Sequence, residues 1–312
     1  MRSAPRWSLV LVTAASALVF APLACTDAAT SPDAASGDGG ADAADRDRDA
    51  GGRTDPEDDA STKDEDASPP AQQEKEPNDG TTTTEIDSMT IPGAMSGTLD
   101  PAKDVDIFAV TPKAGELWQW TLAPSGADLA PHLTVFDTAQ DSKNPTVLAT
   151  SGAGTSAVLQ HFVLSNGSFV AAVRDARNVG GGGNVGGPAF GYTLTATKKT
   201  PSPTTVTVPS TKSGKLASLS SVDLYTFTLT TETELDVIIR ADRKAVPSTL
   251  DSRLSLFDAN AKTSIGTNDD ATGSTIDSQL GGTLPAGTYI AVVENEGTNG
   301  ADLSYEIEFA LR

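Results

Sequence analysis

Six side chains with oxygen donors could together bind a hard cation. Four lie in one polar run. The other two are two positions apart in a predicted β-strand, where residues i and i+2 point to one face. The six residues are Glu74, Glu76, Asn78, Asp79, Asp104 and Asp106. Because Ca²⁺ takes about six to eight oxygen ligands, and because the carboxylates repel one another without an ion, the pattern predicts a calcium site.

A second interpretation of the same residues stays open. Glu74 to Asp79 also reads as the end of an acidic segment whose carboxylates are simply solvated. The second half of the chain offers an internal comparison, because Asp223 matches Asp106 there but nothing like the run at 76–79 precedes it. The calcium interpretation therefore concerns the first half only.

Two further polar segments favour turns and loops over ligand sites. Asn268-Asp269-Asp270, with Asp258 and Asp277 nearby, could supply oxygen ligands, but Asn and Asp commonly bond their own backbone in Asx turns. The glycine-rich stretch 180–187 is not followed by Lys-Ser or Lys-Thr and lies between two predicted strands. It is predicted to be a surface loop and not a phosphate-binding loop.

No catalytic motif accompanies these segments. The two histidines, His132 and His161, have no metal-ligand spacing, and both fall in predicted strands. The sequence contains neither His-Glu-x-x-His nor Gly-x-Ser-x-Gly. We therefore predict a protein without enzymatic activity.

Trp118 and Trp120 form the one ambiguous aromatic feature. They share a predicted strand face with Leu122, which favours burial. The alternative follows from matching Leu117 to Leu235, which puts the tryptophans on the face that Asp236 and Ile238 occupy in the second half. In that case the two indoles would form an exposed platform on which a ligand could stack.

The elements that must position these residues are short strands in two copies of one pattern. The matched segments are 106–108 with 223–225, 132–137 with 253–258, 166–170 with 286–290, and 191–194 with 304–307. Apolar residues alternate with polar ones from Leu303 to Leu311, the period of a half-buried strand, and no helical period stands out. The fold is predicted to be all-β, with two tandem β-sandwiches over residues 74–199 and 200–312.

The N-terminus predicts export. Arginines precede an apolar run from Leu9 to Phe20, which has the form of a secretory signal and is too short to span a bilayer. Residues 22–25, Pro-Leu-Ala-Cys, resemble a bacterial lipobox, although Pro22 stands where Leu is usual. We expect removal of residues 1–24 and acylation of Cys25. The alternative is an ordinary signal cleavage that leaves a free thiol.

Residues 25–73 predict a disordered acidic linker. From Thr26 onward this segment has no Val, Ile, Leu, Met or aromatic residue, so it cannot bury enough apolar surface to offset its ordering entropy. It carries about half of the formal net charge of −20. The chain has no stripe of Lys and Arg to neutralise phosphates, so nucleic acid is not an expected partner.

The segments around the oxygen donors resemble a known family. Residues 74–79 (Glu-Lys-Glu-Pro-Asn-Asp), 97–99 (Gly-Thr-Leu) and 104–108 (Asp-Val-Asp-Ile-Phe) resemble the opening of the bacterial pre-peptidase C-terminal domain family, and residues 251–294 resemble its second half. Both copies together cover nearly all of 74–312. The resemblance implies jelly-roll-like β-sandwiches related to collagenase collagen-binding domains, with calcium sometimes bound near the N-terminal segment.

The resemblance also implies a non-catalytic module for adhesion, targeting or secretion. We therefore expect a lipid-anchored protein of the bacterial cell envelope that binds an extracellular protein or polysaccharide and meets the membrane only through its anchor. Secretion is the alternative location. The alternative function is an accessory or targeting subunit for a separate secreted peptidase or other hydrolase.

Overall fold

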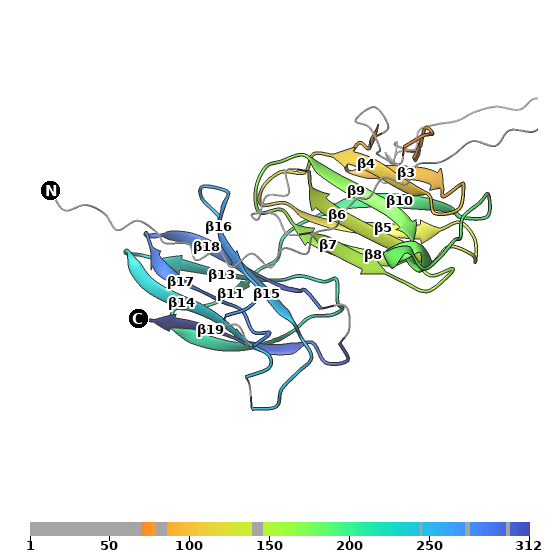
Figure 1. Cartoon of the computed structure of the whole chain (residues 1–312). Helices are drawn as coiled ribbons and strands as arrows, with labels where there is room; N and C mark the ends of the chain where they lie inside the picture. Colours follow the sequence, from red (N-terminus) through yellow and green to blue (C-terminus); the bar gives the residue numbers. More distant parts are fainter. Residues whose placement is uncertain (1–69, 79–85, 139–145, 244, 272–274, 298–299) are drawn as a thin grey trace, which may run out of the picture. The chain divides into compact units, whose positions relative to one another are not determined.

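The all-β prediction is confirmed by a computed structural model (Figure 1). The model describes residues 70–78, 86–138, 146–243, 245–271, 275–297 and 300–312. Secondary structure in these ranges consists of β-strands and one 3₁₀ helix, η1 (Ala176–Gly181), and no helix there is long and apolar enough to cross a membrane. The predicted signal, Cys25, Asp79 and the linker up to residue 69 lie outside the described residues.

The first sandwich packs two five-stranded sheets, ordered β1-β3-β10-β5-β8 and β2-β4-β9-β6-β7. Its strands are β1 (Gln72–Gln73), β2 (Asp87–Ser88), β3 (Gly93–Thr98), β4 (Val105–Val110), β5 (Leu117–Pro124), β6 (Pro131–Asp137), β7 (Val147–Thr150), β8 (Ala157–Phe162), β9 (Phe169–Asp175) and β10 (Gly191–Lys199). The short strands β1 and β2 pair in parallel with β3 and β4, and the remaining neighbours are antiparallel.

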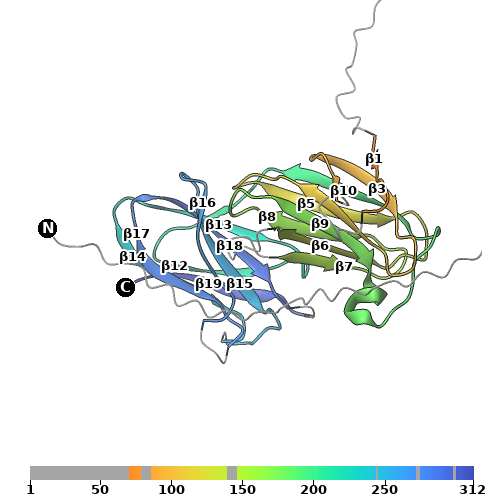
Figure 2. The same ribbon diagram turned by 45° about the horizontal axis from the view of Figure 1, so that its top comes forward.

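The second sandwich has a five-stranded sheet, β11-β13-β18-β15-β16, and a four-stranded sheet, β12-β19-β14-β17. Its strands are β11 (Thr204–Thr205), β12 (Ser210–Lys215), β13 (Asp223–Leu229), β14 (Thr233–Arg240), β15 (Ser252–Asp258), β16 (Thr263–Asn268), β17 (Gln279–Leu284), β18 (Gly287–Asn295) and β19 (Ser304–Leu311). Both sheets are visible in cyan to blue in Figure 2.

The two sandwiches have the same strand topology. Strands β2 to β10 take the places that β11 to β19 take in the second sandwich, as the four matched sequence segments predicted. Register agrees as well, because Asp106 lies opposite Val173 and Asp223 lies opposite Val293. Strand β1 has no counterpart among the described residues of the second sandwich, and the residues that follow β1 carry the acidic run.

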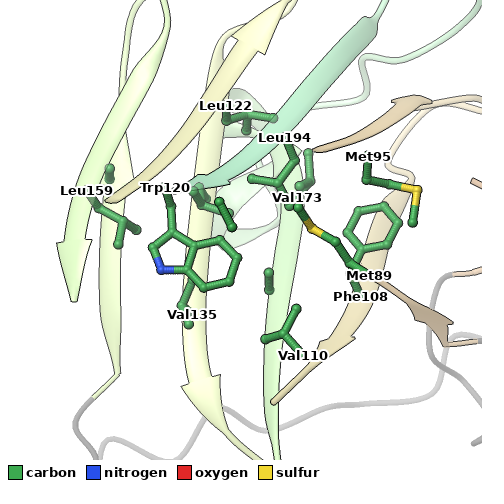
Figure 3. Close-up of a cluster of buried hydrophobic side chains, with 14 of the residues drawn as sticks. Met89, Met95, Phe108, Val110, Trp120, Leu122, Val135, Leu159, Val173 and Leu194 are labelled. Atoms are coloured by element: carbon green, nitrogen blue, oxygen red, sulfur yellow. The ribbon is translucent and has the colours of Figure 1, made fainter. Parts of the chain in front are cut away.

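Each sandwich has its own apolar core, built from the inward positions of alternating strands. In β4, for example, Asp106, Phe108 and Val110 are buried while their neighbours are partly exposed. Figure 3 shows the first core, where Trp120 lies among Val135, Leu159 and other aliphatic side chains. Burial of this kind stabilises by about 25 cal/mol per Å² of apolar surface.

A third apolar cluster contains residues of both sandwiches, which belong to one compact unit of the chain. Phe162 and Phe257 meet edge to face at its centre, with ring centroids 5.3 Å apart. Polar contacts accompany the rings, because the amide of Val222 donates to Oε1 of Gln160 and Ser220 Oγ donates to the carbonyl of Val158.

Candidate cation site in the first sandwich

Three carboxylates of the predicted site come together in the structure. One oxygen from each of Glu74, Glu76 and Asp106 lies within 4.8 Å of the others. Glu74 follows β1 and its amide donates to Ser96 on β3, whereas Asp106 points inward from β4. The parallel pairing of β1 with β3 thus places Glu74 and Glu76 next to Asp106 of the facing sheet.

Backbone and side-chain donors fix the Glu74 carboxylate. Its Oε1 accepts from the amide of Thr98 at 2.5 Å, and its Oε2 accepts from Tyr192 at 2.9 Å and Asn78 Nδ2 at 3.3 Å. A Cβ on Gly97 would lie 2.0 Å from Oε2 of Glu74, so the side chain lies directly over a glycine. Only glycine leaves room for the carboxylate at this point of β3.

Tyr192 connects the carboxylates of Glu74 and Asp106, and it is not among the site residues that the sequence predicts. Its hydroxyl lies 2.5 Å from Oδ2 of Asp106 as well as 2.9 Å from Glu74. One hydroxyl carries a single hydrogen, so it cannot donate fully to both acceptors. A signal existed, because Tyr192 matches Tyr305 between the copies, but a tyrosine in an alternating strand reads as a core residue.

A negative charge on Asp106 is energetically costly without an ion. It is completely buried, and its Oδ1 accepts no hydrogen bond from the described residues. Burial above all, and then the charges of Glu74 and Asp104, raise its pKa to about 9, although the hydrogen bond from Tyr192 acts in the opposite direction. A cation beside Asp106 would offset this cost.

Asn78 supplies a second unpaired oxygen. The side chain is completely buried, and its Oδ1 accepts no hydrogen bond from the described residues. Its own backbone is fixed, because the carbonyl of Asn78 accepts from the amide of Ile107 at 3.0 Å and its amide donates to Glu76 Oε2 at 3.3 Å. Buried polar atoms without partners are uncommon and costly, and a hard cation prefers such oxygens.

The remaining members of the predicted ligand set differ. Asp79 lies outside the described residues. Asp104 does not join the three clustered carboxylates, because Oδ2 accepts from the amide of Asp100 and Oδ1 accepts from the amide of Val105, both at 2.8 Å. Asp104 precedes β4 and caps the turn before it, and its part in the ligand set stays a prediction.

Trp118 and Trp120 are core residues. Their side chains are 3% and 0% exposed, and the Trp118 indole donates to Glu116 at 3.0 Å. The alternative of an exposed stacking platform is wrong, because the two rings pack against each other and the sandwich interior.

Neither histidine belongs to the carboxylate cluster. His161 is fully buried on β8, neither ring nitrogen has a partner among the described residues, and burial followed by the charge of Arg253 lowers its pKa to about 3. His132 on β6 shares a hydrogen bond of 3.1 Å with Thr134. Burial, followed by the charge of Arg174, lowers the pKa of His132 to about 4.

The acidic residues of the second sandwich serve its turns, as predicted. Asp258 accepts from the amides of Asn260 and Ala261, and Asp277 accepts from three consecutive amides, those of residues 241–243. Asn268 bonds the carbonyl of Asp270 through its side-chain amide. The contacts of Asp258 and Asn268 are local, whereas Asp277 caps a segment 34–36 residues away. None of these residues joins a ligand cluster within the described residues.

Comparison with known proteins identifies distant structural similarity only. No family model matches the chain, and no curated protein matches it. The pre-peptidase C-terminal domain of a collagenase from Bacillus anthracis is 13% identical with a TM-score of 0.30, and the match covers 36% of this chain and 97% of that chain. Tandem CBM51 modules of a family 98 glycoside hydrolase from Streptococcus pneumoniae are 11% identical with a TM-score of 0.23, covering 70% and 83%.

A third structure, the human MASP-1/3 CUB1-EGF-CUB2 region, is 10% identical with a TM-score of 0.19, and the match covers 70% of this chain and 99% of that chain. Scores this low carry no argument about function. The strands and the site themselves define the class: a tandem β-sandwich protein with a candidate cation site in its first sandwich. Membership of the pre-peptidase C-terminal family stays a proposal.

Proposed function

We propose that the first sandwich binds a calcium ion through Glu74, Glu76, Asp106 and the side-chain oxygen of Asn78. The observation that carries this proposal is the completely buried carboxylate of Asp106, whose Oδ1 has no partner among the described residues and which clusters with Glu74 and Glu76. Asn78 has a second buried oxygen without such a partner, and its side-chain nitrogen contacts Glu74. Hard oxygen donors with a net negative charge favour Ca²⁺ over softer metals. When bound, the ion supplies the positive charge that the three carboxylates lack.

The role of this ion is structural. Glu74 and Glu76 belong to the segment after β1, and Asp106 belongs to β4 in the other sheet. An ion held by all three joins the two sheets at the edge where the chain enters the sandwich. It binds the folded state alone, so it adds to the free energy of unfolding.

The whole chain then acts as an exported, non-catalytic binding protein. Lipidation at Cys25 would hold it in the bacterial cell envelope, and the tandem sandwiches would bind an extracellular protein or polysaccharide. This proposal rests on the N-terminal sequence and on the family resemblance. It also draws on the described residues, where the one cluster of candidate ligands is made of carboxylates without a histidine or cysteine.

Two experiments test the location and the binding activity. Wild-type protein should partition into detergent, and a Cys25→Ala variant should become soluble, because no helix of the described residues could replace the lost lipid anchor. The full chain should be retained on insoluble collagen fibres or on a polysaccharide in calcium. If the chain is retained on neither polymer and a peptidase co-purifies with it, the accessory function is favoured instead.

A further inference from the structure

The described residues of the second sandwich repeat three parts of the cation site but form no carboxylate cluster. Gly214 on β12 lies opposite Tyr305 on β19, as Gly97 lies opposite Tyr192. The Tyr305 hydroxyl donates to Oδ2 of Asp223 at 2.6 Å, in the way that Tyr192 donates to Asp106. The glycine, the tyrosine and the aspartate are thus present in both sandwiches.

The two sandwiches differ in the group that contacts this tyrosine besides the aspartate. In the first sandwich this group is Glu74, and in the second it is a residue on the strand of Asp223. Phe108 on β4 corresponds to Tyr225 on β13, since the two lie opposite Ala171 and Ala291 in matched registers. The Tyr225 hydroxyl shares a hydrogen bond of 2.9 Å with the Tyr305 hydroxyl. The two rings meet edge to face, with centroids 6.4 Å apart.

The Tyr225 hydroxyl takes the place of the Glu74 carboxylate. A Cβ built on Gly97 would lie 2.0 Å from Oε2 of Glu74 and 2.4 Å from the Tyr192 hydroxyl. A Cβ built on Gly214 would lie 2.6 Å from each of the Tyr225 and Tyr305 hydroxyls. The same space beside the strand glycine therefore holds a carboxylate oxygen in one sandwich and a neutral hydroxyl in the other.

Counting hydrogens explains why this exchange matters. With both carboxyl groups ionised, the first sandwich has two carboxylates around the single hydrogen of Tyr192, so the group lacks positive charge. In the second sandwich Tyr225 donates to Tyr305, and Tyr305 donates to Asp223, so two hydrogens serve one carboxylate. The second network is complete without an ion.

We propose that Tyr225 makes the second sandwich independent of cations, and that a tyrosine at this strand position is incompatible with an ion site in a sandwich of this chain. The claim about ion binding at this strand position rests on the proposed calcium site. The claim about the Tyr225 hydroxyl stands on the hydrogen-bond network alone.

The test exchanges the two residues in the full chain, as Phe108→Tyr and Tyr225→Phe. In Phe108→Tyr the new hydroxyl competes with Glu74 for the space over Gly97, so Ca²⁺ affinity measured by calorimetry should fall at least tenfold. Phe169→Tyr adds a hydroxyl to the same core away from Glu74 and controls for the cost of burying it. It should bind Ca²⁺ as the wild type does.

Peptide-resolved hydrogen exchange tests the role of the Tyr225 hydroxyl. Tyr225→Phe should raise exchange in β12 and β19 about three- to tenfold, the equivalent of one hydrogen bond, with or without Ca²⁺. Wild-type affinity in Phe108→Tyr, or unchanged exchange in Tyr225→Phe, would overturn the inference. A wild type that binds no Ca²⁺ would refute the proposed calcium site, whereas the Tyr225→Phe result would still decide the role of the hydroxyl.

Discussion

Tyr192 reaches from β10 in one sheet to Asp106 on β4 in the other, where its hydroxyl lies 2.5 Å from the buried carboxylate. The same link recurs between Tyr305 and Asp223 in the second sandwich, at 2.6 Å. In both cases a glycine opposite the tyrosine leaves room for the contact. The link between sheets is therefore a shared structural feature, and the carboxylates added around it distinguish the first sandwich.

Gly97→Ala should disrupt the cation site. The added Cβ would lie 2.0 Å from Glu74 and 2.4 Å from the Tyr192 hydroxyl, so both side chains must move. We expect Ca²⁺ binding to be lost and the free energy of unfolding, measured in urea, to fall by about 1–3 kcal/mol.

Gly152→Ala is the matched control. No atom lies within 4 Å of its built Cβ, so its effect should stay within about 0.5 kcal/mol. Equal stability and equal Ca²⁺ affinity of the two variants would show that the close approach at Gly97 has no energetic role.

Trp120→Ala should lower stability and not ligand binding alone. The side chain is completely buried in the first core, so its removal should cost about 3–5 kcal/mol in chemical denaturation. Val158→Ala, at a side chain 44% exposed, should change stability little. A stable Trp120→Ala protein with weakened polymer binding would instead indicate an exposed platform.

His161 should make the protein sensitive to acid. Its folded pKa of about 3 lies below the ordinary value of 6.5, so between these two pH values the unfolded chain binds more protons than the folded chain. Stability therefore rises with pH through this window, and the contribution of His161 is lost as pH falls from about 6.5 toward 3.

A His161→Leu variant measures this contribution. In chelator, its urea midpoint should fall less than that of the wild type when pH is lowered from 7 to about 4.5. His132→Leu should have a smaller effect, since His132 is only partly buried and hydrogen-bonded to Thr134. Parallel pH profiles for wild type and His161→Leu would show that the imidazole gains its proton without unfolding.

Much of the fold followed from the sequence, because duplication and two-residue alternation are visible in the chain itself. Matching 106–108 to 223–225 placed Asp106 and Asp223 on equivalent strands. The site was harder to predict, because its members meet through sheet pairing. The spacing predicts Asp104 as a ligand beside Asp106, but it does not show that both Asp104 oxygens accept backbone amides in a local turn.

Tyr192 escaped prediction for a related reason. It lies 118 residues from Glu74 along the chain, and only the order β1-β3-β10 brings the two together. The burial of Trp118 and Trp120 could be predicted from the shared face with Leu122, since that periodicity is local. Contacts that depend on which strands pair are not encoded in any local pattern.

The calcium-dependent stability of the full chain, compared between wild type and Asp106→Asn, tests the central claim most directly. Asparagine keeps the size of the side chain but removes its charge, and Glu232→Gln removes an exposed charge as a control. Calcium at about 100 times its dissociation constant should stabilise the wild type and Glu232→Gln by about 2.7 kcal/mol relative to chelator, and Asp106→Asn hardly at all. Equal stability of the wild type in millimolar calcium and in chelator would contradict the account.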